Sequence, residues 1–185
     1  MLKKSSMLKK TRVVQNRHRA RELAVQLLYS LGIRPDRNAR ECVDAFISEG
    51  GFAFEESAEI KEYLSFLVEG TWEKRFDIDN KMRMVVTGWR PEHMVAVDRA
   101  VLRLAIFEGF LTKEVPLAVA ISEAVELARA FGTEESGKFV NGVLGKMARD
   151  GEKTSGKTSE KTSGNISIED GKYATDATAA ISTDR

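Results

Sequence analysis

Residues 97–111 read VDRAVLRLAIFEGFL, and this stretch decides the fold. Its apolar side chains cover almost every side of a helix, which is typical of a helix in the centre of a bundle. The other patterned segments also have helical period, and no segment alternates as a strand does. We therefore predict an all-α bundle of about seven helices joined by short loops. The predicted helices cover residues 17–31, 36–49, 57–71, 77–87, 96–111 and 116–131, with a last helix after Thr133.

Residues that favour helix ends support these boundaries. Asp36 or Asn38 is suited to cap the second helix, because a short polar side chain accepts hydrogen bonds from the first free amides. Pro116 suits the first position of a helix, where its missing N–H costs nothing. Thr133 is expected to cap the last helix, and the two glutamates after it complement the helix dipole in the first turn.

The composition excludes several classes of protein. The chain has 185 residues, with 29 Lys and Arg against 28 Asp and Glu, a net charge of +1. No apolar run approaches the roughly 20 residues of a membrane span. The single cysteine, Cys42, excludes an internal disulfide and an all-cysteine zinc site. Only His18 and His93 are imidazoles, which leaves little room for a metal site or a catalytic triad built on histidine.

The charges are unevenly distributed along the chain. Residues 1–21 hold eight basic side chains and no acidic one, whereas residues 22–149 have a net charge of −5. A basic end on an acidic body is typical of a protein that binds a polyanion. A solvated tail that only aids solubility is the alternative reading of the same pattern.

Three parts of the chain differ in composition. Residues 1–13 are predicted to be a disordered basic arm, with no apolar segment of a secretory signal and with Met7 as an alternative start. Residues 14–149 form the predicted helical domain. Residues 150–185 contain the repeating stretch KTSGKTSEKTSG, which has no apolar side chain to offset its ordering entropy, so we predict a disordered low-complexity tail.

No catalytic constellation is evident. The stretch GTEESGK over 132–138 resembles a phosphate-binding loop, but Phe139 stands where a hydroxyl side chain should hold magnesium. Two glutamates inside the stretch would repel phosphates, and the stretch joins two helices rather than a strand and a helix. We therefore expect neither an enzyme nor a cofactor or metal, and recognition by the surface remains.

Several stretches together carry a family resemblance. Residues 16–30 read NRHRARELAVQLLYS, and residues 97–105 read VDRAVLRLA. After Val115-Pro116 come AISEAVELA over 120–128, Phe131-Gly132, and SGKFVNGVL over 136–144. In this order and spacing they resemble the NusB family of bacterial transcription antitermination factors, over about residues 16–148. Residues 32–90 resemble the family only in helical pattern, and both ends of the chain lie outside the match.

The resemblance implies a fold and a function. It implies two small helical bundles and binding to the boxA element of nascent ribosomal RNA transcripts. It also implies a partner, the ribosomal protein that doubles as NusE, and a complex with RNA polymerase and other Nus factors. That complex suppresses premature, Rho-dependent termination in the cytoplasm, without a metal or a nucleotide. Relatives occur as monomers and as homodimers, and the sequence leaves both states open.

The resemblance also implies site residues, which we carry over to matching positions. The implied RNA-binding residues are Arg17, His18, Arg19, Arg21, Tyr29, Glu135, Lys138 and Phe139. Arginine suits this role because it neutralises phosphates and hydrogen-bonds base edges. His18 stands where relatives often have another arginine, and it is mostly uncharged at neutral pH. Tyr29 and Phe139 have an alternative reading as core aromatics, and Glu135 as a helix-dipole partner.

The resemblance also implies a surface for the protein partner. Glu92 and Asp98 are implied to meet the basic NusE partner, and Asp98 could instead cap the central helix. Gly137 departs from the family, where a larger polar residue is frequent.

An alternative function is that of an adaptor for a separate enzyme that modifies ribosomal RNA, because some rRNA methyltransferases carry a NusB-like domain. A further alternative is a protein-only adaptor whose arginines bind an acidic protein.

Overall fold

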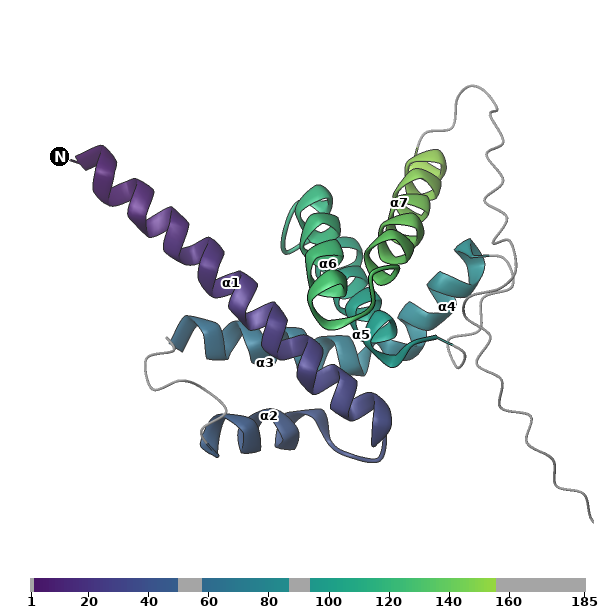
Figure 1. Cartoon of the computed structure of the whole chain (residues 1–185), viewed down its shortest axis with the longest axis horizontal. Helices are drawn as coiled ribbons and strands as arrows, with labels where there is room; N and C mark the ends of the chain where they lie inside the picture. The colour runs from purple at the N-terminus through teal and green to yellow at the C-terminus, as the bar shows by residue number, and fades with distance from the viewer. Residues whose placement is uncertain (1, 50–57, 87–93, 156–185) are drawn as a thin grey trace, which may run out of the picture.

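The computed structural model describes residues 2–49, 58–86 and 94–155, and all the regular secondary structure within them is helical (Figure 1). This confirms the predicted all-α class and the order of the helices. The first three helices are α1 (Leu2–Ile33), α2 (Ala39–Ser48) and α3 (Ala58–Glu73). The remaining helices are α4 (Arg75–Val85), α5 (Ala96–Ala105) with its π-helical continuation η2 (Ile106–Leu111), α6 (Leu117–Phe131) and α7 (Ser136–Ser155). Within these residues no helix is long and apolar enough to cross a membrane.

The helices pack as two bundles that share α5. In the first bundle α1 crosses α3, and α2 packs against α3. In the view of Figure 1, α2 and α6 lie on opposite sides of α3. In the second bundle α6 packs against α5 and α7, and α4 contacts α7. Helix α5 also contacts α1, so its apolar sides are covered by both bundles. Val101, Leu102, Leu104 and Ile106 are accordingly at most 1% exposed.

The N-terminal helix is longer than the sequence analysis predicts. We expected residues 1–13 to be a disordered arm, whereas α1 begins at Leu2 and runs without interruption to Ile33. The segment contains neither glycine nor proline before Gly32, and leucine, lysine, methionine and arginine all favour helix. A helix that is anchored by packing from Ala20 onward can therefore extend outward one hydrogen bond at a time.

The other helix ends are close to their predicted positions. Asn38, rather than Asp36, caps α2, and its side-chain oxygen accepts the amides of Arg40 and Glu41. Helix α7 begins at Ser136, and Thr133 lies in the turn before it, where its amide donates to the Ser136 hydroxyl oxygen at 2.9 Å. At its other end α7 continues to Ser155, so it includes the first six residues of the predicted tail. The rest of that tail lies outside the described residues.

The π-helical turn η2 places one charged side chain inside the protein. At the end of this turn the amide of Thr112 donates to the carbonyl oxygen of Phe107, five residues earlier, at 3.0 Å. The wider turn directs Glu108 into the space between the two bundles, where it is 1% exposed. Gly109 allows this turn to approach α6, because a Cβ atom there would lie 2.6 Å from the Cβ of Ala120. Single π turns inside helices are frequent at functional sites.

Candidate nucleic-acid interface

The basic side chains predicted to bind RNA lie on α1, but they divide into two groups. Arg17, His18 and Arg19 are 36%, 37% and 41% exposed in their side chains, so solvent reaches all three. Arg21 is only 3% exposed. The division follows from the helix, because Arg21 shares the buried side of α1 with Ala20 and Ala24, whereas residues 16–19 are only partly buried.

Arg21 is held by carboxylates from two other elements. Its Nε donates to both carboxylate oxygens of Glu108 at 2.9 Å, and its Nη2 donates to Oε1 of Glu108 at 2.7 Å. Its Nη1 lies 3.2 Å from Oε2 of Glu123 on α6. This geometry differs from the expected contact between Arg21 and a phosphate. In this arrangement Arg21 joins α1 to η2 and α6, and its guanidinium already pairs with two carboxylates.

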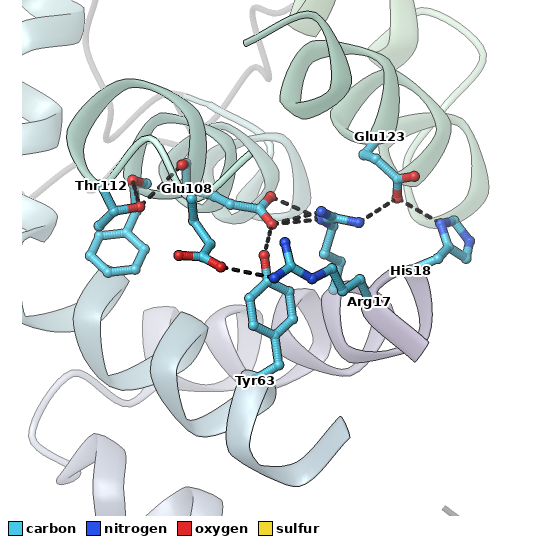
Figure 2. A network of polar contacts seen from close by, with 9 residues as sticks. Arg17, His18, Tyr63, Glu108, Thr112 and Glu123 are labelled. Carbon is cyan, nitrogen blue, oxygen red and sulfur yellow. Dashed lines mark hydrogen bonds and ion pairs between the residues drawn. The ribbon is translucent and has the colours of Figure 1, made fainter. Parts of the chain in front are cut away.

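Tyr63 on α3 completes the network around Glu108. Its hydroxyl donates to Oε1 of Glu108, as Figure 2 shows. Burial raises the pKa of Tyr63, and the hydrogen bond and negative charge of Glu108 raise it further. Burial by itself would lower the pKa of Arg21, but the hydrogen bonds and charges of Glu108 and Glu123 outweigh it and raise the pKa. Both shifts favour the protonated tyrosine and the charged arginine, which are the forms that donate hydrogen bonds to Glu108.

The exposed basic side chains have acidic neighbours as well. The Nη2 atom of Arg17 donates to Oε1 of Glu114 at 2.9 Å, and its guanidinium lies 4.7 Å from the centroid of the Tyr63 ring. The Nδ1 atom of His18 lies 2.8 Å from Oε2 of Glu123. Arg19 pairs with Glu22, 3.0 Å away and one turn along the same helix. The carboxylates orient these side chains and reduce the positive potential that they present.

Tyr29 lies further along α1 on the face that carries His18. The two residues are eleven positions apart, which is close to three helical turns or about 16 Å. Tyr29 is 39% exposed, so part of its ring is accessible from solvent. This exposure supports a role at the surface rather than the alternative role as a core aromatic.

The predicted residues of α7 form a separate edge at the start of that helix. Glu135 and Lys138 are exposed and pair with each other at 3.3 Å. Phe139 is half-buried and packs against the hydrophobic core, in agreement with its position in the apolar stripe of α7. Gly137 is in close contact with Arg129, since a Cβ atom at residue 137 would lie 2.7 Å from the Cγ of that arginine. Glycine at this position leaves room for the stem of Arg129 on α6.

The two predicted partner residues have different outcomes. Glu92 lies outside the described residues. Asp98 lies in the first turn of α5, 1% exposed, and neither of its carboxylate oxygens has a hydrogen-bond partner in the described part of the protein. Burial is the main cause that shifts the pKa of Asp98, and it raises that pKa. The cap position itself is occupied by Val95, so Asp98 is not the N-cap of the central helix.

Sequence reasoning missed the acidic half of this surface. Glu114, Glu123 and Glu108 bind Arg17, His18 and Arg21, respectively, and the sequence analysis assigned a role to none of these three glutamates. One signal was available for Glu108, because a lone carboxylate in the apolar stretch AIFEGFL requires a buried cation. Its partner could not be named, since Arg21 is 87 residues away along the chain. Among the described residues no cluster of three metal-ligating side chains is present.

Comparison with known proteins agrees with this geometry. The family model described as "NusB family" matches residues 18–149. The transcription antitermination protein NusB of Symbiobacterium thermophilum is 39% identical over 72% of this chain and 90% of its own length. The NusB protein of an Anaeromyxobacter species is 44% identical over 71% of this chain and 89% of its own length.

Solved structures lead to the same family. A structure of NusB from T. maritima has 32% identity and a TM-score of 0.63, and it covers 75% of this chain and 96% of that one. A structure of the antitermination factors NusB and NusE in complex with double-stranded RNA contains a chain that is 25% identical, with a TM-score of 0.65 over 74% of this chain and 98% of that one. The expected resemblance is thereby confirmed: this chain belongs to the NusB family of transcription antitermination proteins, which are not enzymes.

Proposed function

We propose that this protein binds boxA-type single-stranded RNA in nascent ribosomal RNA transcripts, together with the ribosomal protein NusE. Bound in this way, it acts in the cytoplasm with RNA polymerase and other Nus factors to suppress premature, Rho-dependent termination. The observation that carries the proposal is the exposed group formed by Arg17, His18 and Arg19 on α1. A homologue of the same fold forms a complex with NusE and RNA, which supports both ligands.

The acidic neighbours of these side chains do not prevent RNA binding. Exposed ion pairs contribute about 0–1 kcal/mol each, so a phosphate can replace a carboxylate at little cost. Arg17 would exchange Glu114 for a phosphate in this way. Arg21 contributes by fixing α1 against α6 rather than by touching the RNA.

The remaining predicted residues extend the surface. Tyr29 offers an exposed ring for base stacking. Lys138 offers an exposed ammonium group, which pairs with Glu135 when no RNA is bound. Phe139 can stack a base only with the part of its ring that the core leaves uncovered. For NusE, we assign the contact to Glu92, because Asp98 is only 1% exposed and so offers little surface to a partner.

The test is fluorescence anisotropy with a labelled boxA-like RNA and a scrambled RNA, with and without the NusE-type partner. We expect the full chain to prefer boxA, and the partner to increase that preference. Arg19→Ala should weaken binding, and it should reduce the salt slope by about 0.7 for each lost phosphate contact. Arg40→Ala, an exposed arginine on α2, is the matched control and should change neither quantity. Equal binding to both RNAs without a partner effect would refute the proposal.

Residues 1–13 add a second, sequence-independent contribution in this proposal. They carry five basic side chains, and the start of α1 continues directly into the exposed basic group. Deleting them should weaken binding to boxA and scrambled RNA equally and lower the salt slope, because phosphate contacts do not read sequence. A deletion that leaves the salt slope unchanged would contradict this role.

A further inference from the structure

A cavity of about 430 Å³ lies between α1, the start of α3 and the segment that follows η2. Arg17 forms one side of it, and the opposite side consists of residues from the outer face of α3. Val13 also lines the cavity and is 47% exposed. None of the residues predicted from the family, other than Arg17, lines it.

One half of this cavity already holds a cation. The guanidinium of Arg17 lies 4.7 Å from the centroid of the Tyr63 ring and 2.9 Å from a carboxylate oxygen of Glu114. An aromatic face together with a carboxylate is a favourable site for arginine, because the ring quadrupole and the negative charge act on the same planar group. The chain itself thus shows which chemical group this cavity accepts.

The other half of the cavity repeats the same chemistry without an occupant among the described residues. Phe66 and Glu62 are one turn apart on α3, so they share a helix face. Phe66 is 38% exposed, and its ring stacks beside that of Tyr63 with centroids 6.0 Å apart and planes inclined by 20°. Phe107 supports the ring from behind at 5.2 Å. The exposed carboxylate of Glu62 has no ion pair or hydrogen bond within the described part of the chain.

The charges of the lining decide between a cation and a nucleotide. Glu59, Glu62 and Glu114 face a single guanidinium, that of Arg17, so the lining has an excess of negative charge. An RNA base could stack on Phe66, but its phosphates would be repelled by these carboxylates. The exposed side chain of Val13 can cover the aliphatic stem of an entering arginine.

We propose that this half of the cavity binds an arginine side chain of a basic polypeptide, with the guanidinium over Phe66 and paired with Glu62. This proposal does not rest on the RNA-binding function proposed above, because it is argued from Glu62 and Phe66, to which no RNA contact is assigned. The site gives the protein a second contact for a basic protein partner, on the face of α3 beside the RNA-binding start of α1.

The test is an NMR titration of the ¹⁵N-labelled full chain with the capped peptide acetyl-Gly-Arg-Gly-amide. The matched control peptide contains citrulline, which keeps the shape of arginine without its charge. We expect saturable shifts of the amides of Val13, Glu62 and Phe66 with the arginine peptide and much smaller shifts with the citrulline peptide. Equal shifts with both peptides, or shifts only elsewhere in the protein, would overturn the proposal.

Variants distinguish binding at this defined site from nonspecific attraction to acidic side chains. Glu62→Gln and Phe66→Leu should each weaken binding of the arginine peptide by about two- to fivefold, the usual effect of an exposed cation–π or ion-pair contact. Glu126→Gln on the exposed side of α6 should leave it unchanged. Loss of affinity in the Glu126 variant equal to that in the Glu62 variant would contradict a defined site. Displacement of the peptide by a short oligocytidine that shifts the Phe66 amide would assign the cavity to RNA instead.

Discussion

Replacing Glu108 by glutamine should strongly destabilise this protein. The substitution keeps the size of the side chain but removes the charge that neutralises Arg21. Both members of the pair are buried, with 1% and 3% of their side chains exposed, so solvent cannot replace the missing carboxylate. Oε2 of Glu123 remains 3.2 Å from Nη1 of Arg21, but the same oxygen also pairs with His18.

The magnitude follows from the cost of a buried charge without its partner. Breaking a buried ion pair by removing one member costs about 3–5 kcal/mol. Glutamine can still accept one hydrogen bond from Arg21, and Glu123 supplies part of the lost charge, so we expect a loss near the lower end, about 3 kcal/mol. Domains of this size unfold with a free energy of about 5–15 kcal/mol, so the change would be a large fraction of the total.

The assay is equilibrium unfolding in urea at pH 7, followed by the helical circular dichroism signal. Glu126→Gln on the exposed face of α6 is the control and should unfold at the wild-type midpoint. The double variant Arg21→Met, Glu108→Leu should be more stable than Glu108→Gln, since it removes both buried charges. A Glu108→Gln variant within about 0.5 kcal/mol of the wild type would refute the reasoning, because that is the range of ordinary surface substitutions.

Three further predictions concern other parts of the molecule. Glu114→Gln should increase RNA affinity about two- to fivefold in anisotropy, because Arg17 no longer has to leave a carboxylate; unchanged affinity would remove Arg17 from the RNA surface. Burial raises the pKa of Asp98, so its charged form costs stability above that pKa and protonation relieves the cost as the pH falls. Asp98→Asn should therefore raise the urea midpoint at pH 7 and raise it less at pH 4, and an equal gain at both values would exclude titration of Asp98 as the cause. Gly109→Ala should cost about 1–3 kcal/mol in the same assay, because the new methyl group meets the Cβ of Ala120 and forces η2 away from α6; a wild-type midpoint would mean that the two elements separate freely.

The sequence predicted this fold well because its signals are local. Apolar residues at helical spacing, Asn38 as a cap and Pro116 before a helix each depend on a few neighbouring residues. The length of α1 was not predicted, because composition describes a basic, polar segment without stating whether a packed helix continues into it. The π turn was not predicted either, because the close approach of Gly109 to Ala120 on α6 is a tertiary contact that helical periodicity does not reveal.

The functional surface divides in the same way. The order and spacing of the quoted stretches were enough to assign the family, and the exposed positions of Arg17, His18 and Arg19 agree with the role implied for them. For Arg21 and Asp98 the implied contacts with RNA and partner differ from what burial allows. The side chains of neighbouring residues in one motif can thus point to solvent or to the interior, because a helix turns by about 100° at each residue.

The sequence by itself determined the helical class, the family and the concentration of positive charge at the N-terminal end. Only the tertiary structure decided which of those charges are accessible, because the carboxylates that bind them come from η2, the following loop and α6, about a hundred residues away along the chain. The cavity beside Phe66 is likewise a property of three separate segments brought together. The physical reason is that side-chain spacing along a helix is fixed locally, whereas burial and charge pairing depend on which helices pack together.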